Sequence, residues 1–397
     1  MDNLGLGRLS PGTLTPMSGE IEVLLTARGG VGSARALMAA GVSRRIIEAA
    51  VRRRLVTRIR QDALVLTALR EAATPWERRV LDARAVGHSL ARPDSHHALS
   101  HTSSLAVLGL PYYGRDSLVH LVRTDGQRGR RDATVWVHRP VDPSWVVEEE
   151  ELRLVEPALA ALQVAATHGA EAGIVALDGV LRQAEEADLA ATQEHNGPAL
   201  DNRHAPALDN RHGTALDNRH APALDNRHAP ALDNRHAPAL DNRHGPARDS
   251  RHGPARERVV ELTERALAEG FGSATHTVRE VVAAADGRSE STGESRTRWL
   301  VRALGWACTP QVELRDEHGQ FVARVDLLLD DWRVVIEFDG AVKYTDPAVV
   351  FAEKDRERRI RDLGYEVVRL RWADLDRPAY VRQLILKAIA RAGASAA

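Results

Sequence analysis

Two carboxylates interrupt apolar runs in the last third of the chain. Asp326 lies within Phe-Val-Ala-Arg-Val-Asp-Leu-Leu-Leu, and Glu337 lies within Val-Val-Ile-Glu-Phe-Asp-Gly. Burying a carboxylate without a partner costs several kcal/mol, so these groups are expected to meet a metal ion, a cation or each other. Oxygen ligands on neighbouring strands suit a hard divalent ion, and such an ion polarises phosphate oxygens. We therefore predict a nuclease metal site in which Asp326 and Glu337 hold Mg²⁺ or Mn²⁺.

The elements around these acids are predicted from the spacing of apolar residues. Asp330 and Asp331 form a turn between two strands, and this hairpin brings Asp326 beside Glu337. The predicted elements are the helix 294–304, the strands 311–315, 320–329 and 332–338, the helix 347–363, the strand 366–371 and the helix 377–392. This order describes a mixed sheet flanked by helices, over residues 288–392.

A cation near the acids would complete a hydrolytic site, because it can orient water or stabilise the developing charge. Lys343, shortly after Gly340, is the first candidate, and Lys354 on the following helix is the second.

The motif E…VD…IEFDG…K…R…LGYEVVRLRW resembles the restriction-endonuclease-like superfamily, in particular its branch close to very short patch repair endonucleases. The resemblance covers roughly residues 288–390. It implies metal-binding acids at Asp326 and Glu337, a helix acid at Glu294 and an active-site polar residue at Lys343.

One position departs from the superfamily pattern of acid, any residue, lysine. That pattern requires a lysine at position 339, where this chain has Asp339. The role of the lysine then moves to Lys343 or Lys354, or is absent.

A second hypothesis for this domain needs no catalysis. The nuclease-like fold would serve as a DNA-binding or packing module, with Asp326 paired to Arg324 or Arg333 and Glu337 held by nearby amides. The basic residues that follow suit either a phosphate backbone or an ordinary solvated surface. They are Arg356, Arg358, Arg359, Arg361, Arg369 and Arg371.

Residues 19–68 show an order of elements that is typical of a winged helix-turn-helix. Ser33 can cap the second helix, Gly41 can adopt a positive φ in the turn after it, and Ser43 can cap the third helix. The predicted elements are helices over 20–27, 34–40 and 44–54, followed by a two-stranded ribbon over 55–66.

The third helix and the ribbon are rich in arginine, with Glu48 as the single acid among them. A cationic face of this kind suits the DNA major groove and its flanking phosphates, and a solvated helix face is the alternative. The predicted DNA-binding residues are Arg44, Arg45, Arg52, Arg53, Arg58 and Arg60, with Arg54 beside them.

The segment SARALMAAGVSRRIIEAAVRRRLVTRIRQDALVL resembles the N-terminal winged-helix domain of the abortive-infection type IV antitoxin family. The glycine-tyrosine pair usual at the end of that wing is replaced here by Asp62 and Ala63. The resemblance implies a transcriptional regulator that binds DNA and has a toxin-like or operon partner protein.

Residues 74–196 are expected to form a small antitoxin-like α/β region and a helical connector. His97 and His101 lie four residues apart in an expected short helix and could share one face. Because no third metal ligand is in view, a polar helix start is favoured over metal binding. Further predictions are strands over 117–123 and 133–139, a solvated acidic connection over 148–151 and a continuous helix over 152–191, to which no chemistry is assigned.

Residues 197–252 repeat a unit of the type APALDNRH in seven copies. Leucine is the one large apolar residue of the unit, so the repeat cannot build a core and is expected to be a disordered linker. Weak metal binding by its recurring histidine is the less favoured alternative. An irregular leader is expected over 1–18 and a further helical connector over 256–287.

The composition suits a soluble globular protein of two or three domains, with 43% hydrophobic and 27% charged residues in a chain of 397. The net charge of −1 does not decide DNA binding, because phosphates respond to local patches. Cys308 is the single cysteine, which excludes an internal disulfide and fits a reducing cytoplasm. No signal-peptide core or membrane-length apolar run is found, so a cytoplasmic protein without a membrane partner is expected.

The predicted fold class is an α+β multidomain protein, with an N-terminal winged helix-turn-helix and a C-terminal restriction-endonuclease-like mixed sheet flanked by helices. The first functional hypothesis is a DNA-binding protein with a divalent-metal-dependent DNA endonuclease domain, whose catalytic residues are Glu294, Asp326, Glu337 and Lys343. The alternative is a non-catalytic, type IV antitoxin-like transcriptional regulator that uses the winged helix.

Overall fold

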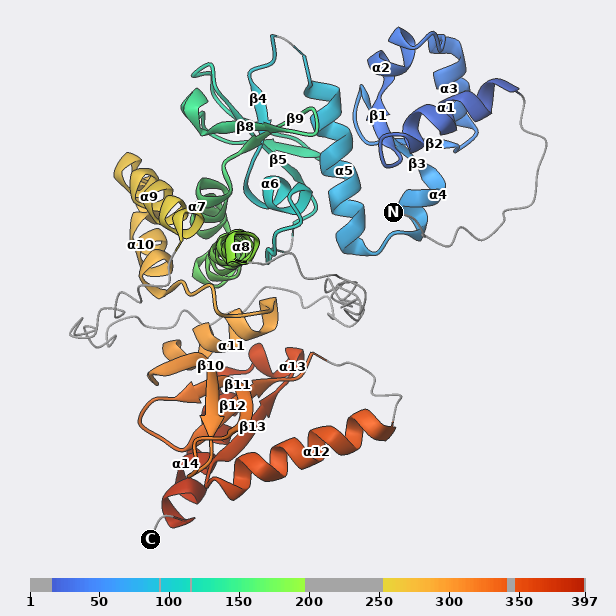
Figure 1. Cartoon of the computed structure of the whole chain (residues 1–397). Coiled ribbons are helices and arrows are strands. Elements are labelled where there is room, and N and C mark those ends of the chain that lie inside the picture. The colour runs from blue at the N-terminus through green and yellow to red at the C-terminus, as the bar shows by residue number, and fades with distance from the viewer. Residues whose placement is uncertain (1–15, 93, 115, 197–252, 341–346, 396–397) are drawn as a thin grey trace.

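The computed structural model describes residues 16–92, 94–114, 116–196, 253–340 and 347–395, and Figure 1 labels its elements. Lys343, the octapeptide repeat and most of the expected leader lie outside these residues. Helices and three separate sheets make up the described chain, so the predicted α+β class is confirmed. None of the helices in these ranges combines the length and the apolar character needed to cross a bilayer.

Three helices and a small antiparallel sheet form the N-terminal part. The elements are α1 (Pro16–Thr26), β1 (Val31–Ser33), α2 (Ala34–Ala39), α3 (Arg44–Arg52), β2 (Val56–Arg58) and β3 (Ala63–Leu66). The strands lie in the order β1-β3-β2. Apolar side chains from all three helices meet the sheet in one core, which includes Ile21, Leu37, Ile47 and Leu64.

The predicted caps and ribbon of this part are largely confirmed, and one strand is additional. The Ser33 hydroxyl accepts a hydrogen bond from the Ala36 N–H at 3.1 Å and so caps α2. Gly41 has a φ of +99° in the turn before α3. Ser43 occupies the cap position of α3 without a side-chain bond. Strand β1 was not expected, because three residues are too few to show alternation.

A six-stranded mixed sheet forms the middle part, with strand order β6-β7-β5-β4-β9-β8. Helix α5 packs between this sheet and strands β1 and β3 of the N-terminal part (Figure 1). The elements are α4 (Thr67–Ala72), α5 (Pro75–Leu90), β4 (His97–Leu99), α6 (His101–Val107), β5 (Val119–Arg123), β6 (Arg130–Arg131), β7 (Val135–Val137), β8 (Val146–Glu149), β9 (Leu152–Val155) and α7 (Pro157–His168).

The short helix expected around His97 and His101 is partly wrong. Residues 97–99 form strand β4, whose Ala98 and Leu99 are buried and pair with β5. Helix α6 begins only at His101, so the two histidines do not share a helix face.

The continuous helix expected over 152–191 is also wrong. Leu152 and Leu154 alternate into the core from strand β9, and Pro157 then opens α7. Gly169, with a φ of +91°, separates α7 from the next helix. The acidic run 148–151 is not a plain connection, because its first two residues belong to β8 and its last two form the turn to β9.

Helices α8 (Ala170–Asn196), α9 (Pro254–Glu269) and α10 (Thr275–Ala284) pack on one another beside the middle sheet. The Asp188 carboxylate of α8 accepts hydrogen bonds from the Ala255 and Arg256 N–H groups at 2.9 and 3.0 Å. These donors belong to the first turn of α9, so Asp188 satisfies that helix end from outside.

A four-stranded sheet forms the C-terminal part, with strand order β10-β11-β12-β13. The first three strands are antiparallel neighbours, and β13 runs parallel to β12. The elements are α11 (Thr292–Ala303), β10 (Cys308–Arg315), β11 (Phe321–Leu329), β12 (Val334–Phe338), α12 (Pro347–Asp362), β13 (Glu366–Leu370), α13 (Trp372–Leu375) and α14 (Pro378–Ser395). The predicted element order is confirmed, with the short α13 added. Helices α11 and α14 share one core with the sheet, and α12 shares another.

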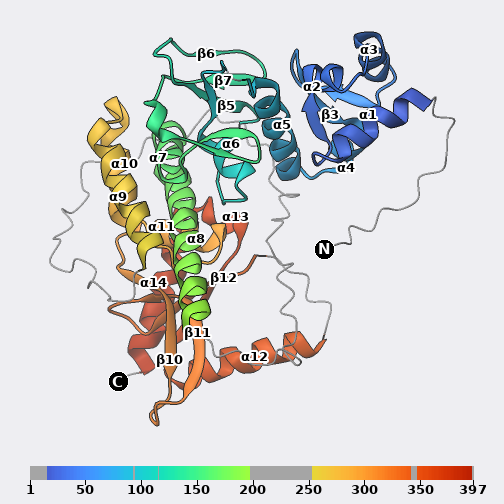
Figure 2. The same ribbon diagram turned by 45° about the horizontal axis from the view of Figure 1, so that its top comes forward.

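Helix α8 extends from the middle part to the C-terminal part, where it contacts α11 (Figure 2). Arg298 of α11 donates to both carboxylate oxygens of Asp178 in α8, at 2.8 and 2.7 Å. Both side chains are 1% exposed. The remaining donors of Arg298 bond the Ala284 carbonyl and the Ser289 hydroxyl, and Asp178 also accepts from the Asp286 N–H.

Replacing residues 197–252 by a six-residue Gly/Ser linker should change the melting temperature by no more than about 2 °C. Asn196 lies about 12 Å along α8 from Asp188, and six residues can span about 20 Å. Differential scanning fluorimetry of the full chain and the shortened chain measures the change. In either chain, Asp188→Ala should lower the melting temperature by about 2–4 °C, because α9 loses its cap. A large drop on shortening alone would show that the repeat is more than a linker.

Candidate functional site

Asp326 and Glu337 lie on neighbouring strands, as the hairpin hypothesis requires. Strands β11 and β12 pair Leu327 with Ile336 in antiparallel register, which sets the two acids side by side. Both line a pocket of about 160 Å³, together with Phe338, Asp339, Glu353, Arg356 and Arg369. The structure therefore brings the two predicted metal ligands together on the two central strands of the C-terminal sheet.

Glu294 lies near the start of α11, where the Ser291 hydroxyl caps the helix. Its carboxylate accepts hydrogen bonds from the Glu290 N–H, the Ser291 hydroxyl and the Gln311 side-chain amide, each at 2.9 Å. Burial raises the pKa of Glu294 despite these donors. Glu294 does not line the pocket itself, but its charge acts on Asp326.

Among the acids of the pocket, Asp326 has the pKa that departs most from its ordinary value. Burial, followed by the charges of Glu294 and Glu337, raises its pKa to about 7, although the Phe338 N–H donates to its Oδ2 at 2.9 Å. A carboxyl group with this pKa exchanges its proton near neutral pH and gains from any cation that reaches it.

Glu337 is 7% exposed and is held by arginines. Arg356 of α12 donates to its two oxygens at 2.7 and 3.1 Å, and Arg369 of β13 lies 3.6 Å away. Arg369 also pairs with Glu353 and, at 3.1 Å, with Glu357. The pocket thus balances acids against two guanidinium groups.

The partners expected under the packing hypothesis are wrong. Arg324 pairs with Glu290, and Arg333 donates to the Leu363 carbonyl, so neither meets Asp326. The packing hypothesis paired Asp326 with an arginine and Glu337 with amides. The structure shows the reverse: Asp326 accepts a hydrogen bond from a backbone amide, and Glu337 pairs with an arginine. Arg356, for which the sequence suggested a phosphate contact or a solvated surface, instead pairs with Glu337.

The lysine of the site is not among the described side chains of the pocket. Lys343 lies outside the described residues, and Lys354 is exposed on α12 without lining the pocket. Asp339, at the position where the superfamily pattern needs lysine, lies 3.7 Å from the Arg371 guanidinium. Among the described residues, the cations that line the pocket are Arg356 and Arg369.

The oxygen donors of this pocket fit a hard divalent ion in type, with one condition. Asp326 keeps Oδ1 for an ion while Oδ2 accepts the Phe338 amide, but both oxygens of Glu337 face Arg356. An ion could use Glu337 only after Arg356 moves or shares the carboxylate.

The predicted DNA-binding arginines divide into two groups. Arg44, Arg45, Arg52 and Arg53 are exposed on or just after α3. The two arginines of the ribbon are half-buried: Arg58 pairs with Glu48 at 2.8 Å, and Arg60 lies close enough to the middle sheet to affect His97 there. The α3 group alone forms an open cationic face.

Comparison with known proteins identifies weak relatives. The chain is 32% identical over 109 residues to two uncharacterized proteins of Mycobacterium tuberculosis, from strains CDC 1551 / Oshkosh and H37Rv. The match spans 26% of this chain and 39% of each relative. No family model matches the chain, and no solved structure matches it significantly.

The raised pKa of Asp326 predicts a specific pH dependence of stability. A carboxyl group whose pKa is about 7 in the folded protein and about 3.9 in the unfolded protein favours the folded state most at low pH. This stabilisation is lost as pH rises from about 4 to 7. The Asp326→Asn variant does not lose stability in this way. Its free energy of unfolding relative to wild type should therefore rise by about 2–4 kcal/mol between pH 4.5 and 8.

Urea unfolding at several pH values measures this difference. Glu317→Gln, an exposed carboxylate in the turn between β10 and β11, is the matched control and should show a flat difference. A flat difference for Asp326→Asn as well would contradict the raised pKa.

Proposed function

We propose that this chain is a DNA-binding protein whose C-terminal part is a divalent-metal-dependent DNA endonuclease acting in the cytoplasm. The observation that carries the proposal is the convergence of Asp326 and Glu337 in one pocket, with the pKa of Asp326 raised to about 7. Perturbed acids of this kind concentrate at catalytic sites. The strand order and the helix positions support the restriction-endonuclease-like interpretation.

In this proposal Asp326 and Glu337 hold Mg²⁺ or Mn²⁺, whose chemistry there is to polarise a phosphate oxygen and acidify a bound water. Glu294 keeps the neighbourhood of Asp326 negative and so favours a cation. Arg356 and Arg369 supply positive charge at the pocket wall, where a scissile phosphate would sit. Lys343 stays the proposed additional cation.

Purified protein should nick supercoiled plasmid in Mg²⁺ or Mn²⁺, and Asp326→Asn or Glu337→Gln should each slow nicking by about 100-fold or more. Agarose gels of the time course provide the rates. Glu317→Gln controls for carboxylate loss elsewhere on the same domain. Equal nicking by wild type and both acid variants would assign the activity to a contaminant and end the enzyme proposal.

A second candidate function rests on the exposed arginines of α3. In it, the N-terminal part acts as a winged helix that binds an operator, as in a type IV antitoxin-like regulator with a toxin-like partner. The cationic face suits the major groove. Both functions could reside in one chain, because the arginines and the acid pocket lie in separate parts of the fold.

Arg44→Ala combined with Arg45→Ala should weaken DNA binding about tenfold and flatten the slope of log affinity against log salt concentration by about 2. Fluorescence anisotropy with a labelled duplex at several salt concentrations measures both. Arg382→Ala, an exposed arginine on α14, should leave both unchanged. Unchanged binding in the α3 variant would place the DNA surface elsewhere.

A further inference from the structure

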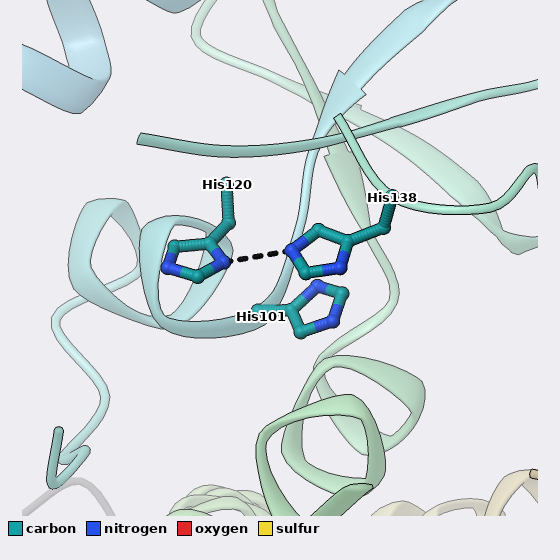
Figure 3. Close-up of side chains that lie close together, drawn as sticks. All are labelled: His101, His120 and His138. Atoms are coloured by element: carbon teal, nitrogen blue, oxygen red, sulfur yellow. Dashed lines mark hydrogen bonds between the residues drawn. The ribbon is translucent and has the colours of Figure 1, made fainter. Parts of the chain in front are cut away.

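A cluster of imidazoles and one carboxylate lies in the middle part, separate from the acid pocket. His101 begins α6, His120 lies in β5, His138 follows β7, His168 ends α7, and Asp116 precedes β5. Figure 3 shows three of these rings against one another. The sequence offered no third ligand beside His97 and His101, and in the structure other histidines from distant segments lie close to His101.

We propose that Asp116, His120 and His168 bind one Zn²⁺ ion, and that His138 orients His120 from behind.

The candidate ligand atoms of Asp116, His120 and His168 all lie within 4.8 Å of one another. Asp116 Oδ1 lies 2.9 Å from His120 Nε2, and Asp116 Oδ2 lies 3.5 Å from His168 Nε2. Tetrahedral zinc with bonds of about 2.0–2.1 Å separates its ligand atoms by about 3.3 Å, so small shifts suffice to admit the ion. The rings of His120 and His168 meet edge to face, with centroids 5.6 Å apart and planes at 69°.

His168 Nε2 points independently to a ligand. This nitrogen is buried and lacks a hydrogen-bond partner within the described part of the chain, since the 3.5 Å approach of Asp116 is too long to satisfy it. Buried polar atoms are almost always satisfied, and a bound ion is one of the standard explanations when the protein alone does not satisfy them.

His138 supplies the outer contact that metal-binding histidines usually have. Its Nε2 lies 2.8 Å from His120 Nδ1, along the line that joins the two rings in Figure 3. If His120 donates its Nδ1–H to His138, its Nε2 lone pair faces Asp116 and His168 and is available to zinc.

His101 is close but is not assigned as a ligand. Its ring stacks on that of His138, with centroids 3.7 Å apart and planes at 20°. A metal ion lies in the plane of each imidazole that binds it, and two stacked rings cannot both meet this condition. His101 therefore holds His138 in place, as does Trp136, which stacks on His138 as well.

The competing explanation is a polar network without metal, in which Asp116, His120 and His138 only share protons. The metal content of the purified protein distinguishes the metal-free network from the zinc site. The full chain, purified and dialysed against citrate to remove loosely held ions, should retain one equivalent of zinc by mass spectrometry. Co²⁺ added to protein from which the zinc has been removed should give the visible absorption of a tetrahedral site.

Asp116→Asn and His168→Gln should each reduce retained zinc to a small fraction of one equivalent, with circular dichroism unchanged. His138→Gln should weaken zinc binding by about 10–100-fold, as loss of an outer partner does. His97→Gln, which changes a half-buried histidine of the same sheet outside the cluster, should retain zinc. The repeat histidines remain in every variant, so loss of zinc in Asp116→Asn and His168→Gln would show that the repeat does not hold the ion.

Two results would overturn the proposal. Retention of no zinc by wild type, together with no absorption after addition of Co²⁺, would favour the metal-free network. Loss of zinc in His101→Gln but not in Asp116→Asn or His168→Gln would move the ion to the three-histidine group.

Discussion

The buried ion pair between Arg298 and Asp178 is the interaction on which the position of the C-terminal part depends. A guanidinium and a carboxylate that are each 1% exposed can remain charged only as partners, and removal of either one costs about 3–5 kcal/mol in comparable proteins. Asp286, Ala284 and Ser289 use the remaining donors and acceptors, so the pair leaves little unsatisfied. Helices α8 and α11 are consequently held together by a contact that tolerates little displacement.

This constraint reaches the acid pocket through α11. Arg298 and Glu294 are one helical turn apart, so fixing the first fixes the second. Arg296, between them, bonds Glu171 of α8 and Asp376 near the end of α13, which ties the same helix to both parts. Glu294 then bonds Gln311 of β10, and its charge helps to raise the pKa of Asp326. The electrostatics of the pocket thus depend on a joint with the middle part.

The sequence was sufficient to predict the order of elements at both ends of the chain, because periodicity and turn residues are local signals. It also placed Asp326 beside Glu337, since one hairpin joins them. It could not show that Arg356, distant in sequence, would pair with Glu337, because that contact depends on how α12 packs on the sheet.

The middle part was harder to predict for the same physical reason. Strands β4 and β9 are only three and four residues long, too short for alternation to mark them as strands. His101, His120, His138 and His168 belong to four different elements, and their spacing in the sequence carries no common period. Only the packing of α6 on the middle sheet and of α7 on α6 brings them together.

Arg356 links the two binding events that the proposed nuclease requires. Its two hydrogen bonds to Glu337 are charge-assisted, and each such bond contributes about 1.5–3 kcal/mol. In the proposed nuclease, a divalent ion that used Glu337 would have to compensate for this loss and would therefore bind weakly to the free protein. In the proposed nuclease, a DNA phosphate would replace the Glu337 carboxylate as the partner of Arg356. Glu337 would then be available to the ion. If both bind as proposed, DNA and metal would strengthen each other's binding by the same factor, since coupling between two equilibria is reciprocal. In the proposed nuclease, Arg356 would thus withhold Glu337 from the ion until DNA binds.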